Sequence, residues 1–273
     1  MGNETVILKD LTIGYTTKGN EKVVASGLNA AIKSGELTCL LGPNGIGKST
    51  LLRTLSAFQP ALGGDVLLKE SNCQLSSQRH TLKERTVNYQ LLSRLIGVVL
   101  TEKLAIKNIT AEELIGMGRA PYTGFWGRLT EEDHQVVRDA IRQVGIESLS
   151  GCMIQTLSDG ERQKVMIAKA LAQQTPIIYL DEPTAFLDYP SKVEMMQLLR
   201  RLAVQEQKTI FLSTHDVELS LQVADCIWLM EPNQLSVGTP HQLAEQGVLS
   251  RFIEREGITF DRDSLTIRVT ATS

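Results

Sequence analysis

Length, composition and charge restrict the classes of protein to which this chain can belong. It has 273 residues, a hydrophobic content of 42% and a formal net charge of −3 at pH 7. This length fits one large α/β domain or one domain with a subdomain, and no apolar run reaches the roughly eighteen residues that a membrane-spanning helix needs. The acidic balance disfavours nucleic acid as a partner. The cysteines form no C-x-x-C pair, which is typical of reduced thiols in the cytosol: Cys39, Cys73, Cys152 and Cys226.

The first motif is a glycine-rich loop between a predicted buried strand, 37–41, and a predicted helix that opens at 49–55. It matches the pattern G-x-x-x-x-G-K-[ST] at every fixed position, with the residues Gly42, Pro43, Asn44, Gly45, Ile46, Gly47, Lys48, Ser49 and Thr50. Such glycines let backbone N–H groups turn toward phosphate oxygens, and the helix start adds its dipole. Lys48 then reaches the β- and γ-phosphates, and the Ser49 hydroxyl ligates Mg²⁺. The motif predicts a nucleoside triphosphate site, with a ligand-free glycine turn as the weaker alternative.

Strands are expected on both sides of this loop. Besides the strand 37–41 that leads into the loop, the predicted strands are Thr5–Leu8, Val66–Lys69, Ile96–Leu100, Pro176–Asp181, Thr209–Ser213 and Cys226–Met230. The runs around Cys39, Ile178 and Phe211 are apolar on both faces, as in a parallel sheet.

A helical block interrupts the strands between about 103 and 157. Thr110 begins a capping box, Thr130 is expected to cap the next helix, and that helix is expected to stop at Gly145. The block is therefore expected to be an inserted helical subdomain. A polar, basic-leaning stretch at 78–90 precedes it and is expected to be a solvated insertion, with contact to a membrane or a partner as the weaker alternative.

Two acidic residues stand at the carboxyl end of the predicted strand 176–181. An Asp-Glu pair in this position is usually a solvated strand end, but here the same chain carries a phosphate-binding loop. Asp181 is then placed to hold Mg²⁺ through a water, and Glu182 to accept a proton from attacking water. His215 follows the neighbouring strand and is expected at the same edge, although an isolated histidine is more often a surface or capping residue.

A third motif, Leu157-Ser158-Asp159-Gly160-Glu161-Arg162-Gln163, precedes a helix rich in Ala, Lys and Leu. Its Ser158 and Glu161 also fit an ordinary capping box. In this order and spacing, however, the loop, this segment and the acidic pair resemble the motifs of ABC ATPases. The resemblance extends from about Thr5 to Gln246.

The resemblance implies a fold. The expected class is an α/β P-loop NTPase of the ABC ATPase type, with a mixed sheet core, an antiparallel β-subdomain and the inserted helical subdomain. One such domain would fill 1–273, with about 247–273 as a C-terminal extension. Within that extension a hairpin with a turn near Asp263-Ser264 is expected.

The resemblance also assigns roles to residues, with ATP and Mg²⁺ as the ligands and ATP hydrolysis as the reaction. The matched positions are Glu182, His215 and Lys48 for catalysis, Ser49, Asp181 and Thr101 for the metal, and Tyr15 (stacked on adenine), Gly42, Pro43, Asn44, Gly45, Ile46, Gly47, Lys48, Ser49, Thr50, Ser158, Gly160, Glu161 and Asp188 for the nucleotide.

Two segments depart from the family pattern. Thr101, with Glu102 beside it, stands where the family usually has a glutamine, and which of the two replaces that glutamine is open. The signature segment has Asp159 and Glu161 where glycine and glutamine are commoner. Asp159 adds a carboxylate near a phosphate site, and Arg162 is placed to compensate its charge.

A further stretch points to a subgroup of the family. Gly118–Tyr122 and Phe125–Asp133 resemble ATPase subunits of importers for iron–siderophore complexes, haem and cobalamin. This implies an ATP-hydrolysing homodimer at the cytoplasmic face of the inner membrane, peripheral to it, with permease subunits as partners and, indirectly, a substrate-binding protein. Two alternatives stay open: a soluble ABC ATPase of the iron–sulfur cluster assembly type, and a low-turnover regulatory nucleotide-binding module.

Overall fold

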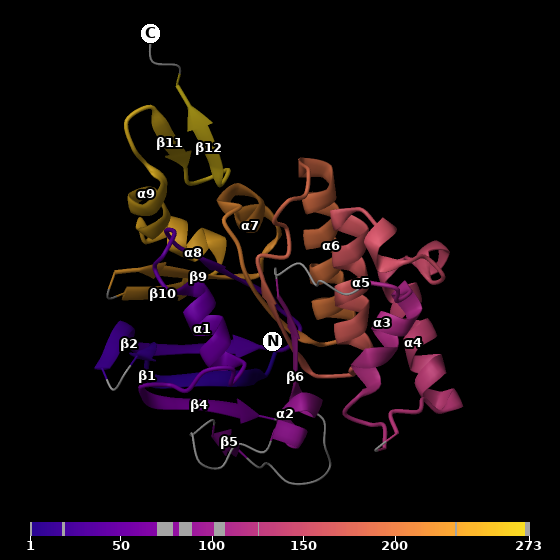
Figure 1. The fold of residues 1–273 in the computed structure, drawn as a ribbon. Helices are drawn as coiled ribbons and strands as arrows, with labels where there is room; N and C mark the ends of the chain where they lie inside the picture. Colours follow the sequence, from indigo (N-terminus) through magenta and orange to yellow (C-terminus); the bar gives the residue numbers. More distant parts are fainter. Residues whose placement is uncertain are drawn as a thin grey trace.

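The computed structural model describes residues 2–17, 20–69, 79–81 (backbone alone), 89–100, 107–124, 126–232 and 234–270. In these segments an antiparallel sheet and a mixed sheet enclose helix α1 (Lys48–Leu55), and further helices lie beside the mixed sheet (Figure 1). The fold class expected from the sequence is confirmed.

The mixed sheet positions the functional site. Its described strands follow the order β10-β9-β3-β8-β7-β6, with neighbours parallel except for β10 against β9. Their bounds are β3 Leu37–Leu41, β6 Ile96–Val99, β7 Ile177–Asp181, β8 Thr209–Ser213, β9 Cys226–Glu231 and β10 Gln234–Gly238. Strands β3 and β8 are buried along their whole length, because both faces of the sheet are covered. The predicted parallel strands are confirmed, and β10 adds an edge that was not expected.

The second sheet is antiparallel, with the order β2-β1-β4-β5 in the described chain. Its strands are β1 Glu4–Thr17, β2 Asn20–Lys33, β4 Gly63–Lys69 and β5 Arg79–Thr81. Strand β1 is longer than the predicted run 5–8, and β2 was not predicted. Much of β2 is exposed and its register against β1 shifts at several points, so its sequence lacks regular apolar alternation.

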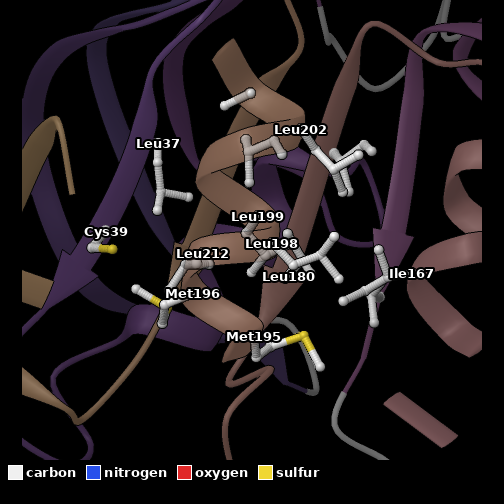
Figure 2. Close-up of a cluster of buried hydrophobic side chains, with 14 of the residues drawn as sticks. Leu37, Cys39, Ile167, Leu180, Met195, Met196, Leu198, Leu199, Leu202 and Leu212 are labelled. Atoms are coloured by element: carbon white, nitrogen blue, oxygen red, sulfur yellow. The ribbon is translucent and has the colours of Figure 1, made fainter. Parts of the chain in front are cut away.

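Helices cover both faces of the mixed sheet. Those outside the central block are α1, α2 Tyr89–Leu95, α6 Tyr189–Gln205, α7 Val217–Val223, α8 Pro240–Glu245 and α9 Val248–Ile253. Helix α1 packs with both sheets in one apolar cluster. On the opposite face, Met196 and Leu199 of α6 lie toward Leu37 of β3 and Leu212 of β8 (Figure 2). The carboxyl ends of β3, β7 and β8 are thereby held in a rigid layer.

The central helices form a separate group on one side of the molecule (Figure 1). They are α3 Ala111–Gly116, α4 Glu131–Val144 and α5 Asp159–Ala172, with 3₁₀ turns at Met117–Arg119, Glu147–Leu149 and Ile154–Thr156. Thr110 and Thr130 both form capping boxes, and Gly145 ends α4 at a φ of 72°. These predicted helix limits are confirmed, whereas the division of the chain at about 103 and 157 stays a prediction.

A short hairpin follows α9. Strands β11 (Ile258–Asp261) and β12 (Thr266–Val269) pair antiparallel, and the Asp261 carboxylate accepts N–H bonds of 3.1 Å from Asp263 and Ser264 in the turn. The expected hairpin is confirmed. No helix in the described residues is long and apolar enough to cross a bilayer.

Candidate nucleotide-binding site

The glycine-rich loop joins β3 to α1 and needs its glycines for conformational reasons. Gly42, Gly45 and Gly47 have φ angles of 153°, 76° and 116°, a region that residues with a Cβ rarely adopt. A Cβ on Gly47 would also lie 2.4 Å from Val24 Cγ1. At the start of α1, Gly47 provides no side-chain cap, so the first amides of the helix are available to an anion. The local geometry fits the phosphate-binding role predicted from the motif.

Lys48 lies within this loop and is only 5% exposed. Its Nζ donates to the carbonyl oxygens of Gly42 at 2.8 Å and Pro43 at 3.1 Å. Burial lowers the pKa of Lys48, while the charges of Glu182 and Asp181 act in the opposite direction. The ammonium group is therefore positioned beside the loop and the two acids, as expected for a phosphate ligand.

Ser49 and Asp181 lie side by side although they are far apart in the sequence. The Ser49 hydroxyl donates to Asp181 Oδ1 at 3.3 Å, from the start of α1 to the end of β7. A hydroxyl and a carboxylate are oxygen ligands of the kind that Mg²⁺ prefers, and Mg²⁺ is usually held by few protein groups together with substrate phosphates. In the described residues no cluster of three His, Cys, Asp or Glu side chains offers a fuller protein cage. The pair therefore fits a Mg²⁺ that is shared with a nucleotide.

Glu182 and His215 also meet, as their placement on neighbouring strands predicted. His215 Nε2 lies 2.5 Å from Glu182 Oε1, and His215 Nδ1 lies 3.5 Å from Lys48 Nζ. Glu182 has a φ of 47°, an unusual value for a residue with a side chain. The structure thus brings the three residues expected to be catalytic into one connected group.

Tyr15, the residue expected to stack on adenine, lies near the C-terminal end of β1. Its hydroxyl is hydrogen-bonded to Thr50 Oγ1 of α1, and the residue is 43% exposed. An exposed ring tied to the helix of the phosphate loop is well placed to contact a base.

The signature segment and Asp188 interact locally. Ser158 caps α5, and its Oγ donates to Glu161 Oε2 at 2.8 Å. Asp188 caps α6 by accepting the N–H of Ser191 at 2.9 Å. A Cβ on Gly160 would lie 3.6 Å from Leu187 Cδ2, so the signature segment and the segment before α6 are neighbours.

Arg162 forms the ion pair that was expected to compensate Asp159, with Nη1 at 2.9 Å from Asp159 Oδ1. Thr101, its neighbour Glu102 and Phe125 lie outside the described residues, as does most of the stretch 78–90. The metal role of Thr101 stays a prediction.

Sequence reasoning missed the contacts of two residues that flank His215. Ser213, which is fully buried, donates to Asp181 Oδ1 at 2.6 Å. Asp216 accepts from Thr184 Oγ1 and Lys192 Nζ, both at 2.9 Å. Both lie in the polar run around His215, but a polar run at a strand end does not reveal which side chains point inward.

Comparison with known proteins identifies the family of the chain. The sequence profile of the family described as ABC transporter matches residues 25–185, more than half of the chain. An uncharacterized ABC transporter ATP-binding protein of Methanocaldococcus jannaschii is 37% identical over 253 residues, which cover 92% of this chain and 82% of that protein. The petrobactin import ATP-binding protein of Bacillus anthracis is 35% identical over 225 residues, covering 82% and 79%. The ferric enterobactin transport ATP-binding protein of Escherichia coli is 33% identical over 244 residues, covering 89% and 84%.

Solved structures agree in fold. A dimeric bacterial ABC transporter cassette superposes with a TM-score of 0.70 at 26% identity, covering 86% of this chain and 98% of that one. An inward-facing metal-chelate type ABC transporter gives a TM-score of 0.76 at 22% identity, covering 98% and 97%, and supports the fold. By this match over most of its length, the chain belongs to the ABC transporter family, among its ATP-binding and ATP-hydrolysing subunits.

Proposed function

We propose that this chain hydrolyses ATP as a homodimer beneath two permease subunits, and that hydrolysis drives uptake of an iron chelate, haem or a cobalamin-like compound. The observation that carries the proposal is the convergence of Lys48, the Ser49–Asp181 pair and the Glu182–His215 pair at one sheet edge. It occurs in a chain whose relatives include siderophore-import subunits.

Each residue of this edge has a role in hydrolysis. Lys48 exchanges its carbonyl partners for phosphate oxygens, which as charged acceptors bind an ammonium group more strongly. Glu182 accepts the proton of attacking water, and His215 orients the Glu182 carboxylate. Bound with ATP beside Ser49 and Asp181, Mg²⁺ would neutralise charge on the β- and γ-phosphates.

The signature segment supports a dimeric active form. Ser158 and Gly160 stand at the start of the fourteen-residue helix α5, where backbone N–H groups favour an anion. We assign this segment to the nucleotide on the partner copy, with Glu161 and Asp188 beside it. The similar solved cassette is described as dimeric, which supports a dimeric active form.

An exposed aromatic groove supports the permease as partner. It has a volume of about 290 Å³ and lies between the end of α1, helix α2 and strand β6. Phe58 and Tyr89 line it and are 61% and 72% exposed, so the groove presents two aromatic rings to an occupant. Gln173, which follows α5, also lines the groove, so an occupant would contact both the core and the helical group. A short apolar helix of the permease fits this chemistry.

The names of the relatives favour transport over the two alternatives. Those of Bacillus anthracis and Escherichia coli are described as import or transport proteins for petrobactin and ferric enterobactin. We accordingly propose iron chelates as the first cargo class, and a location at the cytoplasmic face of the inner membrane. The relatives' names do not favour a cluster-assembly ATPase or a regulatory module.

The partner is tested by affinity purification from detergent-solubilised host membranes, followed by mass spectrometry. We expect a polytopic permease with the parent chain and with Val204→Ala, which alters an exposed apolar residue on α6. A Phe58→Ala/Tyr89→Ala double variant should lose it. Soluble partners alone would support the cluster-assembly or regulatory alternative.

The cargo is tested in a host strain that lacks the chain. Accumulation of ⁵⁵Fe-siderophore, labelled haem and labelled cobalamin is measured after complementation with the parent or with Glu182→Gln. We expect the parent, and not the variant, to restore one of the three. Undiminished uptake of all three in the deletion strain would contradict an importer of this class.

A further inference from the structure

Ser213 stands at the centre of the sheet edge that carries the site. It is the last residue of β8, is fully buried, and pairs in register with Asp181 of β7 and Leu40 of β3. Strand β3 leads into the phosphate loop and β7 into the two acids, so Ser213 lies between the segments that must act together. Of the fully buried residues of β8, it is the one at the carboxyl end, where ligands of parallel sheets bind.

The Ser213 hydroxyl makes two hydrogen bonds that link different parts of the site. It donates to Asp181 Oδ1 at 2.6 Å, and it accepts the backbone N–H of Glu182 at 3.1 Å. A hydroxyl has one donor and two acceptor positions, so one group can serve both partners. The bond to Asp181 is short, as expected where the acceptor is a carboxylate.

Each of these two hydrogen bonds restrains one of the two acids, Asp181 on the metal side or the expected base Glu182. Asp181 Oδ1 also accepts from Ser49, so Ser213 sets the direction from which this carboxylate faces the metal position. The Glu182 N–H is held by both the hydroxyl and the carbonyl oxygen of Ser213, each at 3.1 Å. The anchored residue is Glu182 itself. Its left-handed backbone conformation turns its side chain toward His215.

We propose that Ser213 is a positioning residue. Through its single hydroxyl it holds the metal-side carboxylate Asp181 and the base Glu182 in their relative positions. This rests on the proposed roles of Asp181 and Glu182. An alanine of similar packing volume would leave the strand intact but free both acids from their common anchor.

The variants Ser213→Ala, Ser213→Cys and Ser213→Thr separate the hydroxyl from the volume that it fills. Alanine removes it, cysteine keeps the volume with much weaker hydrogen bonding, and threonine keeps the hydroxyl. Ser250→Ala is the matched control, because Ser250 is also buried and hydrogen-bonded, to Arg262 in the C-terminal part of the chain. Thermal unfolding of each variant establishes that it is folded.

Two readouts distinguish positioning from general damage. The first is the affinity for a fluorescent ATP analogue in EDTA and again at increasing Mg²⁺, and the second is kcat with KM for ATP. For the alanine and cysteine variants we expect an EDTA affinity within about twofold of the parent. The Mg²⁺ concentration for half-maximal binding should rise, and kcat should fall, by about 10- to 100-fold each, the usual effect of removing an outer-shell partner. Threonine should restore most of both.

The proposal is overturned if the folded alanine and cysteine variants match Ser250→Ala in Mg²⁺ requirement and kcat, or if a folded threonine variant is as impaired as alanine. Glu182→Gln is measured in parallel. If it turns over like the parent, the assigned base is wrong and the role of Ser213 falls with it. If it is inactive while Ser213→Ala is normal, the role of Ser213 alone is refuted.

Discussion

His215 and Glu182 are joined through their side chains, with Nε2 of the histidine 2.5 Å from Oε1 of the glutamate. On the other side of the ring, Nδ1 lies 3.5 Å from Nζ of Lys48. A neutral imidazole has one donor and one acceptor nitrogen. With Nε2–H donating to the carboxylate, Nδ1 is left to accept from the ammonium group. His215 therefore connects the phosphate-loop lysine with the proposed base.

Glu182→Gln should abolish turnover, with a loss of about 10²- to 10⁴-fold in kcat, because the amide keeps the shape of the side chain but accepts no proton. The same variant should accumulate as an ATP-bound dimer, since ATP then remains unhydrolysed between the copies. Phosphate release and light scattering with Mg-ATP measure the two effects. A monomer at protein concentrations where the parent dimerises would contradict the second.

Lys48→Ala should weaken nucleotide binding itself. The ammonium group is buried in the loop among carbonyl oxygens, and its loss removes a positive charge from the phosphate site. We expect at least a tenfold loss in affinity for a fluorescent ATP analogue, since a charge-assisted hydrogen bond contributes about 1.5–3 kcal/mol. Lys9→Ala, at an exposed position of β1, is the control and should bind as the parent does. Parental affinity in Lys48→Ala would exclude the assigned role.

Tyr15 should contribute through its ring rather than its hydroxyl. Tyr15→Phe loses the hydrogen bond to Thr50 but keeps the aromatic face, so ATP affinity should change by less than about threefold. Tyr15→Ala should lower it by roughly 5- to 150-fold, the effect of about 1–3 kcal/mol of base stacking. Titration with ATP and with inorganic triphosphate checks the prediction, because only ATP carries the base. An equal loss for both ligands would place Tyr15 elsewhere in the mechanism.

Arg119→Ala should destabilise the helical group. Arg119 is 5% exposed, and its side chain bonds to Asp133 Oδ1, the Ala172 carbonyl oxygen and Gln174 Oε1, each at 2.8 Å. Removing one partner of a buried ion pair leaves the other charge uncompensated, at a cost of about 3–5 kcal/mol. Arg138→Ala breaks an exposed pair with Glu131 that solvent screens, so it should cost much less. Urea unfolding of both variants measures the difference, and equal costs would refute the argument.

The contribution of Asp133 to the stability of the fold should decrease at low pH. The backbone N–H of Thr130, and then Arg119, lower the pKa of the Asp133 carboxyl from 3.8 to about 2. A carboxyl with a lowered folded-state pKa contributes stability that is fully present above its unfolded pKa, near 4, and is lost as the pH falls through 2. The difference in Tm between the parent and Asp133→Asn should therefore be largest above pH 4 and shrink toward pH 2. A difference that does not vary with pH would contradict this assignment.

The local segments of the site were predictable because consecutive residues determine their conformation. The glycines that permit positive φ angles in the loop can be identified directly from the sequence, and so can the capping residues Thr110 and Thr130. Strand β8 was predicted with its observed limits, since a short apolar run buried on both faces is distinctive. Strand β2 was missed, because an exposed strand with shifted register carries no such pattern.

The amino-acid sequence by itself determined the phosphate loop, the acidic pair and the signature segment, because each depends on neighbours along the chain. Only the tertiary structure decided that Ser213 holds Asp181 and Glu182 together, and that His215 lies between Glu182 and Lys48. These contacts join the start of α1 to the ends of β7 and β8, which are distant from it in sequence. Their alignment arises from packing on both faces of the sheet, which brings together segments that lie far apart along the chain.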